Sequence, residues 1–103
     1  FESMRIYRGY LFLTDAIRDA KSTQPLAVAK AMEKTTVSIG DYKATMRAAD
    51  HQAQLPLNLS VLAPDAKYKQ DGTPWGFRLI RTFPAAQVSE PVDGCNMKRP
   101  PGA

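Results

Sequence analysis

Asp50 and His51 are the residues whose types could perform acid–base chemistry. His51 is the only histidine of the chain, and a carboxylate that orients an imidazole can produce a general base. Neighbours in sequence seldom reach that geometry, so we expect Asp50, His51 and Gln52 to cap a turn and to hydrogen-bond nearby backbone groups. The sequence has no nucleophile elbow, phosphate-binding glycine loop or dinucleotide fingerprint. We therefore predict no catalytic residues and no enzyme activity.

Cys95 is the only cysteine. With one histidine and one cysteine, a metal site would need carboxylates, and no metal-ligand spacing is present, so we predict no metal and no cofactor. A lone cysteine in a small chain is most often a free, partly buried thiol. In an exported protein, an odd cysteine instead indicates a partner outside this stretch. Both alternatives stay open.

The composition is that of one small globular domain. The chain has 103 residues, of which 44% are hydrophobic and 23% charged. Its net charge of +4 comes from 14 Lys and Arg against 10 Asp and Glu. The positive residues are scattered, whereas nucleic-acid binders gather them on one face, so we predict no nucleic-acid partner. No apolar run approaches the ~20 residues of a membrane span. The chain opens on Phe1, which is compatible with a processed or omitted upstream segment.

Hydrophobic residues at helical spacing predict a first helix over residues 3–20. Its apolar face is formed by Ile6, Tyr10, Leu13 and Ile17. Gly9 inside this helix costs about 1 kcal/mol relative to Ala. It indicates either close packing against another backbone or a tolerated surface glycine.

A second helix is expected to follow a short connection. Ser22 or Thr23 can cap it, and Pro25 suits its first turn. It should end near Lys34, and its inner face should consist of Pro25, Val28, Ala29 and Met32.

Alternating apolar and polar side chains predict strands in the second half of the chain. Residues 42–47 alternate between two faces, and residues 35–39 and a Gly40-Asp41 turn lead into them. A polar turn over residues 48–52 follows, in which Asp50 should bond backbone groups just after it. Residues 57–63 and 76–83 predict two more strands of a three-stranded sheet.

The last strand and the tail complete the expected elements. In residues 76–83, Phe77 and Leu79 should lie on one side and Arg78, Ile80 and Thr82 on the other. A polar loop with a tight turn at Asp71-Gly72 precedes this strand. Prolines and glycines after residue 83 predict an extended tail that is fastened at a few points.

Three segments resemble the C-terminal part of the branched-chain amino acid-binding proteins of ABC importers. They are residues 10–17 (YLFLTDAI), 20–33 (AKSTQPLAVAKAME) and 46–52 (MRAADHQ), with Arg-Ala-Ala-Asp-His-Gln the most specific feature. The late Cys95-Asn96-Met97 before Arg99-Pro100 also resembles tails in this family. Gln24 stands where an acidic residue is usual and Lys21 where glycine is common, which puts only local capping in doubt.

The resemblance implies the type I periplasmic-binding fold, a two-lobed α/β protein several times longer than this chain. The isolated fragment would be α+β, with two N-terminal helices followed by a small, mainly antiparallel sheet. About residues 1–50 would belong to one lobe, and about residues 51–103 to a crossover and the other lobe. Because a fragment lacks its upstream partners, it should expose apolar surface and dimerise or swap elements.

The resemblance also implies a non-enzymatic periplasmic component that binds amino acids or related solutes and is recognised by ABC permeases. The family's ligand-binding residues come mainly from upstream loops, so none can be assigned here. Tyr68 and Trp75 could reach a cleft, but we expect them to pack against the other lobe or the surface. The alternative is a free-standing small protein-interaction domain.

Overall fold

The computed structural model describes residues 2–101, which divide into two compact units. Unit 1 comprises the chain up to Leu55 together with the chain from Glu90 onward, and unit 2 comprises Pro56–Ser89. The chain therefore leaves unit 1 after Leu55 and re-enters it at Glu90. The helices and strands confirm the expected mixture of helices and small antiparallel sheets.

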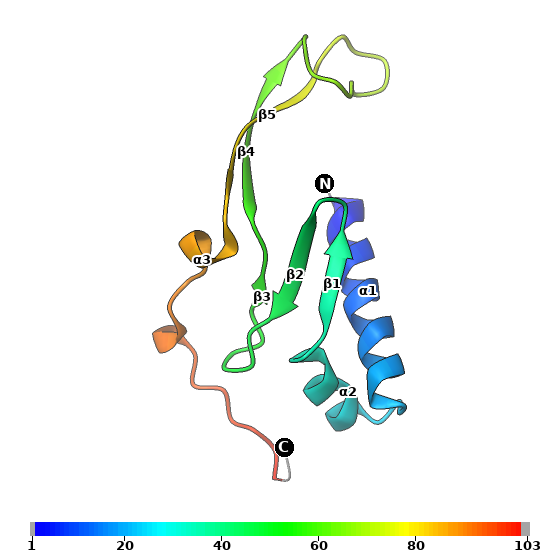
Figure 1. Ribbon diagram of the computed structural model, residues 1–103, viewed down its shortest axis with the longest axis vertical. Coiled ribbons are helices and arrows are strands. Elements are labelled where there is room, and N and C mark those ends of the chain that lie inside the picture. The colour runs from blue at the N-terminus through cyan, green and yellow to red at the C-terminus, as the bar shows by residue number, and fades with distance from the viewer. Residues whose placement is uncertain (1, 102–103) are drawn as a thin grey trace. The chain divides into compact units, whose positions relative to one another are not determined.

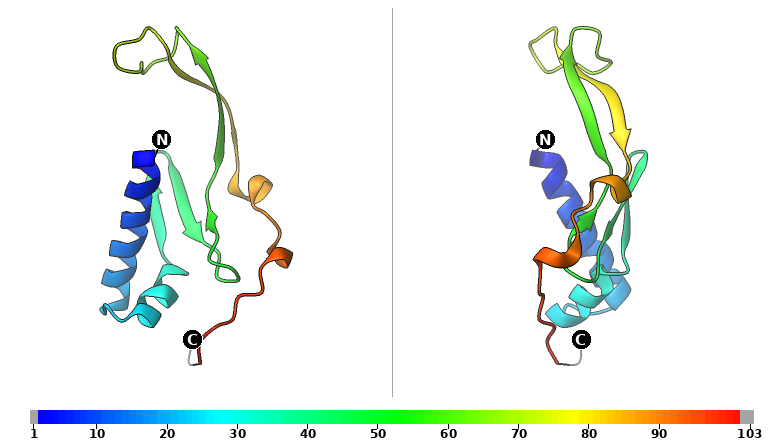
Figure 2. Two further views of the ribbon diagram at one scale, coloured as in Figure 1. Left: turned by 180° about the vertical axis from the view of Figure 1, so that it is seen from behind. Right: turned by 90° about the vertical axis from the view of Figure 1, so that its left-hand side faces the viewer.

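Unit 1 begins with helices α1 (Glu2–Ala20) and α2 (Pro25–Met32). Helix α1 runs alongside strand β1 in every view (Figure 1, Figure 2). Its Phe12 side chain is 4% exposed and belongs to the core of the unit. The other buried residues of that core are Val37, Ile39 and Ala44, and Leu11, Met32, Tyr42, Met46 and Leu55 pack against them.

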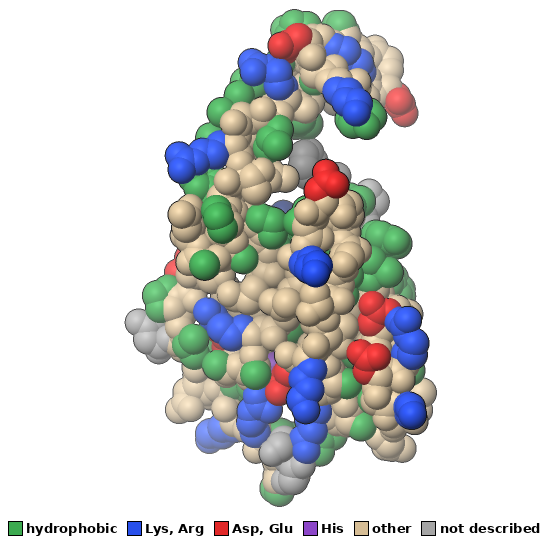
Figure 3. Space-filling view, in the orientation of Figure 1, with side chains coloured by type: hydrophobic (Ala, Val, Ile, Leu, Met, Phe, Trp, Pro, Cys, Tyr) green, Lys and Arg blue, Asp and Glu red, His purple; other side chains and the backbone are tan. Residues whose placement is uncertain are grey.

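The apolar face predicted for α1 is not the face that packs within unit 1. Of its four residues, Ile6, Tyr10 and Leu13 are 60%, 64% and 41% exposed and only Ile17 is half-buried, whereas Phe12 and Ala16 are buried. Hydrophobic side chains accordingly gather on the outer surface of the first half of α1 (Figure 3). The predicted helix is confirmed, but its strongest apolar face is uncovered.

The structure decides the alternatives for Gly9 and corrects the predicted cap of α2. A Cβ atom added at Gly9 would meet nothing within 4 Å, so the surface alternative for this glycine is the correct one. Ser22 and Thr23 do not cap α2, since Gln24 is its N-cap and makes no side-chain cap bond. The Ser22 hydroxyl instead accepts the backbone N–H of Gln24 at 3.1 Å. Lys21, which follows α1, has a φ of +51°, in the left-handed region that favours glycine.

A three-stranded antiparallel sheet completes unit 1, in the order β1 (Thr36–Ile39), β2 (Tyr42–Met46) and β3 (Ala53–Gln54). Gly40, with a φ of +56°, turns β1 into β2 as predicted. The predicted sheet of residues 42–47, 57–63 and 76–83 is wrong. Because β1 and β3 occupy the two edges of β2, residues 57–63 cannot pair there.

Unit 2 is an antiparallel hairpin of β4 (Leu57–Ala63) and β5 (Gly76–Phe83), as the alternation predicted for each strand. A bulge between Leu59 and Ser60 shifts the register, so that Ser60 lies opposite Leu79 while Asn58 lies opposite Thr82. Thr82 therefore shares a face with Leu79, and its hydroxyl lies 2.8 Å from the Asn58 amide oxygen. The prediction that Thr82 lies on the other face of the hairpin from Phe77 and Leu79 was wrong, because the bulge shifts the alternation of side chains by one residue.

The loop between β4 and β5 folds back on itself. Gly72 has a φ of +73°, which confirms the predicted tight turn. The backbone N–H of Gln70 donates to the carbonyl of Trp75 at 2.8 Å. A Cβ atom at Gly76 would clash with the Tyr68 carbonyl oxygen, so only glycine fits where β5 starts.

The tail contains a four-residue helix α3 (Ala85–Val88) in unit 2 and a short 3-10 helix η1 (Val92–Gly94) in unit 1. The absence of a long regular element over the described tail confirms the prediction from its prolines. Among residues 2–101, no helix is long and apolar enough to span a membrane.

Candidate functional site

The turn between β2 and β3 is closed by backbone hydrogen bonds. The N–H of His51 donates to the carbonyl of Arg47 at 2.8 Å, and the N–H of Arg47 donates to the carbonyl of Gln52 at 2.9 Å. His51 has a φ of +57°, a left-handed conformation that histidine adopts more readily than most residues. The Asp50 carboxylate accepts the N–H of Gln52 at 3.1 Å, which confirms the capping role predicted for it.

The Arg47 guanidinium is the centre of this turn. Its Nε and Nη2 donate to the two Asp50 oxygens at 2.9 and 2.5 Å, a bidentate ion pair. Nη2 also donates to the Gln52 side-chain oxygen at 2.8 Å, and Nη1 donates to the Glu90 carbonyl at 2.8 Å. The side chains of Arg47 and Asp50 are only 20% and 9% exposed. The arginine therefore joins the turn to the start of the C-terminal segment.

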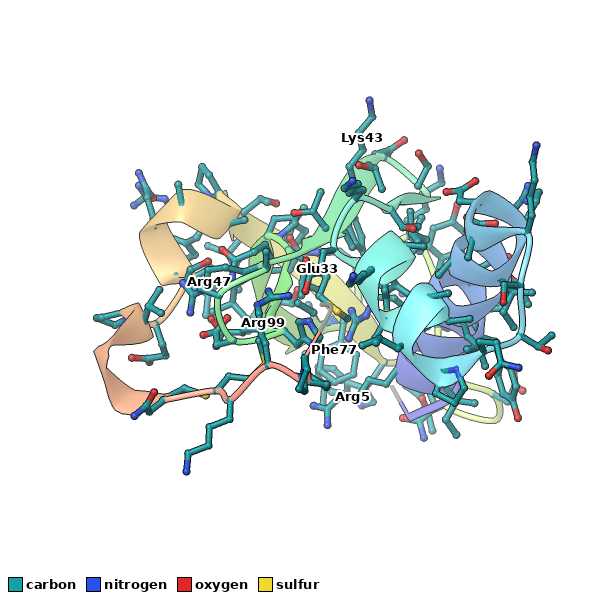
Figure 4. All side chains as sticks on the ribbon, turned by 90° about the horizontal axis from the view of Figure 1, so that it is seen from below. Arg5, Glu33, Lys43, Arg47, Phe77 and Arg99 are labelled. Atoms are coloured by element: carbon teal, nitrogen blue, oxygen red, sulfur yellow. The ribbon has the colours of Figure 1, made fainter. Side chains whose placement is uncertain are left out.

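A second ion-pair group fastens the rest of that segment. Oε1 of Glu33, just beyond α2, lies 2.7 Å from His51 Nε2 and 2.7 Å from Arg99 Nη1. Nη2 of Arg99 also donates to the Ala48 carbonyl. Figure 4 shows the Arg99 side chain beside Glu33. Together with the Arg47 contact, these bonds confirm a tail that is fastened at a few points.

Both carboxylates of the site favour their ionised forms. The hydrogen bond from His51, followed by the one from Arg99, lowers the pKa of Glu33. The Arg47 hydrogen bond lowers the pKa of Asp50 to about 2, and the Asp50 carboxylate raises the pKa of Arg47. A carboxylate whose pKa is lowered is a weaker base than an ordinary carboxylate, because general-base catalysis works best with a pKa near the operating pH. The arrangement is suited to holding segments of chain together.

The acid–base pair considered from the sequence is not the one that forms. Asp50 pairs with Arg47, while His51 contacts Glu33, which is 18 residues away in sequence. Glu33 and Arg99 were missed as partners because no local pattern links residues so far apart, whereas Arg47 lies only three residues before Asp50 and its spacing could have indicated the ion pair. Among the described residues, no group of His, Cys, Asp and Glu could hold a metal ion.

A small pocket of about 100 Å³ lies beside this site in unit 1. It is lined by Leu26 and Ala29 of α2, by Glu33 and His51, and by residues 97–100. Pockets for small-molecule ligands usually measure about 300–1,000 Å³. This pocket is therefore far smaller than a usual ligand site, and we assign no ligand-binding residue to it.

The remaining candidates from the sequence are Cys95, Tyr68 and Trp75. Cys95 is free and exposed, so the expected partial burial of its thiol is wrong, and its pairing outside this stretch remains a prediction. Tyr68 and Trp75, in the loop of unit 2, are 75% and 45% exposed. Tyr68 is covered on one side by Lys67, whose Nζ lies 5.1 Å from the ring centroid.

Comparisons with known proteins agree in sequence and in structure. Leu/Ile/Val-binding protein homolog 4 of Brucella abortus, and its counterparts in Brucella suis and Brucella melitensis, are each 41% identical to this chain over 76 residues. The match covers 73% of this chain and 17% of each relative, so the matched part of this chain spans about one sixth of the length of those proteins. No protein-family model matches the chain.

A solved structure extends the likeness to three dimensions. It is the closed conformation of the leucine-, isoleucine-, valine-, threonine- and alanine-binding protein from Brucella ovis, with a TM-score of 0.80 and 31% identity. The likeness covers 89% of this chain and 25% of that protein. The chain therefore belongs to the family of the Leu/Ile/Val-binding proteins, as a segment of such a protein with part of the type I periplasmic-binding fold.

Proposed function

We propose that this chain is the C-terminal portion of a non-enzymatic solute-binding component of an ABC importer, which binds amino acids in the periplasm. The observation that carries the proposal is the 41% identity to proteins named for binding leucine, isoleucine and valine. The TM-score of 0.80 to a protein named for binding five amino acids supports the same class of ligand.

Uncovered apolar surface supports the idea that this chain is part of a larger protein. On α1, Ile6, Tyr7 and Tyr10 are each more than half exposed. The hairpin of unit 2 exposes apolar side chains on both of its strands, namely Leu57, Leu59, Leu62, Phe77, Leu79 and Ile80. Soluble monomers rarely expose so much contiguous apolar surface, and the remainder of a two-lobed protein would cover it.

We assign the two compact units to the two lobes. Unit 1, with the helices and the C-terminal segment from Glu90, would belong to one lobe, and unit 2 would belong to the other. The sequence alone suggested a single change of lobe near residue 50. The division into units favours two passages, after Leu55 and before Glu90, and hence a return of the tail to the first lobe.

The proposed mechanism is closure of the two lobes around an amino acid, after which permeases of the importer recognise the closed form. The ligand-binding residues would come mainly from parts of the protein outside this chain. The small pocket beside Glu33 is consistent with this, because about 100 Å³ is well below the usual size of a ligand site.

The first test is the intact mass and oligomeric state of the natural gene product, followed by calorimetric titration with leucine, isoleucine, valine, threonine and alanine. We expect a monomer several times longer than 103 residues that binds at least one of these amino acids with 1:1 stoichiometry. The 103-residue chain is the matched control and should bind none of them. A natural product of only this length that folds as a stable monomer would refute the proposal and favour a small protein-interaction domain.

A further inference from the structure

The chain passes between its two units twice, and hydrogen bonds link Arg47 to the boundary residue Glu90 directly and to the end of β3 through Gln52. The outgoing passage follows Leu55, directly after β3, and the returning passage reaches unit 1 at Glu90. Strand β3 is held by its pairing with β2, at Thr45–Gln54 and Met46–Ala53. Glu90 has no such ladder, and its carbonyl is held by Nη1 of Arg47 at 2.8 Å.

Arg47 connects these two passages through four hydrogen bonds. One goes to Glu90 on the returning side, and the others go to Asp50 and Gln52 of the turn that leads into β3. The Gln52 side-chain oxygen also accepts from the Gln54 amide at 3.3 Å, so the network extends to the last residue of β3. A guanidinium suits this task because its planar fork reaches several acceptors at fixed angles.

Both passages are also stiffened by proline at the boundary of unit 1. Leu55 precedes Pro56 and Glu90 precedes Pro91. A residue before proline is restricted to extended conformations, which removes one source of backbone freedom at each boundary. The returning passage is therefore held by the Arg47 guanidinium directly, through Glu90, and the outgoing passage indirectly, through Gln52 and Gln54.

We propose that Arg47 is a positioning residue of the hinge. Its hydrogen bonds link the outgoing and returning passages within unit 1. The two passages would therefore act as a single hinge between the units and would not bend independently. Asp50 acts through Arg47, because its bidentate ion pair fixes the orientation of the guanidinium. The inference rests on the proposed function, in which closure of two lobes brings the protein around its ligand.

Arg99 provides a matched control within the same unit. It also ties the C-terminal segment to unit 1, through Glu33 and the Ala48 carbonyl, and its charge equals that of Arg47. Glu33 and Ala48 both lie outside β3 and away in sequence from Glu90, so these Arg99 contacts do not link the two passages. Loss of Arg99 should loosen the end of the tail and leave the pivot intact.

The test uses the natural gene product without amino acid and a pair of spin labels, one in each unit. In a Cys95→Ser background, Asp19→Cys on α1 and Asp71→Cys in the loop of unit 2 introduce labels at exposed positions. Pulsed electron paramagnetic resonance then gives the distribution of distances between the units. We expect Arg47→Gln to widen this distribution at least about twofold, and Arg99→Gln to leave its width unchanged. Arg47→Lys should also widen it, because an ammonium cannot reach all four acceptors.

An unchanged width in folded Arg47→Gln and Arg47→Lys proteins would overturn the inference, as would equal widening in Arg99→Gln. If Arg47→Gln does not fold, Arg47→Lys alone decides between these outcomes, because it keeps the charge beside Asp50. Titration with amino acids is a separate readout. A product that binds none of them but shows the widening would keep the hinge inference and refute the proposed function.

Discussion

Replacement of Phe12 tests whether the core of unit 1 lies where the structure places it. Phe12 is 4% exposed and packs with Val37, Ile39 and Ala44. Removing a buried phenyl ring usually costs about 3–5 kcal/mol, from lost burial and from the cavity that remains. We therefore expect Phe12→Ala to lower the free energy of unfolding of the 103-residue chain by about 3–5 kcal/mol.

Tyr10 is the matched control, because it lies two residues earlier in the same helix and also carries an aromatic ring. It is 64% exposed, so Tyr10→Ala should change the free energy of unfolding by no more than about 0.5 kcal/mol. The sequence pattern predicts the reverse, since it places Tyr10 on the main apolar face of α1 and Phe12 outside it.

Urea unfolding of the 103-residue chain, followed by far-ultraviolet circular dichroism, measures both changes. With a denaturant slope of about 1–3 kcal/mol per molar urea, Phe12→Ala should lower the midpoint by about 1–5 M. Equal losses for the two variants, or a larger loss for Tyr10→Ala, would refute the assignment of the core. In the full-length product, the rest of the protein would cover the apolar face of α1 that carries Tyr10. The proposed function therefore predicts that Tyr10→Ala lowers the free energy of unfolding of that product.

Three further changes test local features. Lys21→Gly should raise the free energy of unfolding by about 0.5–1 kcal/mol, because relief of the left-handed strain exceeds the entropic cost of glycine; a lower urea midpoint would contradict this. Gly76→Ala should cost about 1–3 kcal/mol, since the new methyl group would clash with the Tyr68 carbonyl; unchanged loop protection in hydrogen exchange would count against that contact. Acid should destabilise unit 1, because the pKa of Asp50 is lowered to about 2 and that of Glu33 is also lowered, while the unfolded values are about 3.9 and 4.3. The unfolded chain then binds more protons, so this contribution is complete above about pH 5 and is lost as the pH falls toward 2. Urea midpoints between pH 7 and 3 should show the loss, and Asp50→Asn should reduce it.

Local patterns were sufficient for most of the elements. The helical spacing over residues 3–20 and the alternation over residues 42–47 each predicted an element that is present. The glycine-containing turns at Gly40 and Gly72 were also predictable, because a positive φ is a property of a few neighbouring residues. Asp50 was correctly assigned to turn capping for the same reason, since its acceptor lies two residues from its donor.

Partners distant in sequence could not be predicted in this way. The side-chain period of a strand says which residues share a face, but it does not say which strand lies at each edge. The three-stranded sheet was predicted from the wrong strands because nothing local showed that β1 and β3 take the two edges of β2. The bulge that returns Thr82 to the face of Leu79 also has no local signal. The contact of His51 with Glu33 could not be predicted either, because the two residues are 18 positions apart. The sequence suggested only Asp50, the neighbour of His51, as its partner.

The sequence by itself determined the family, the types of element and the polar turn at Arg47. These depend on residue identity and on spacings shorter than about two helical turns, for which chain geometry alone brings the side chains together. Only the tertiary structure decided which face of α1 is buried, which strands pair and which segments Arg47 and Arg99 connect. In each case several segments of the chain could pair with the same strand edge, helix face or charged side chain. Which of them does so depends on the free energy of the whole folded chain and not on any local spacing.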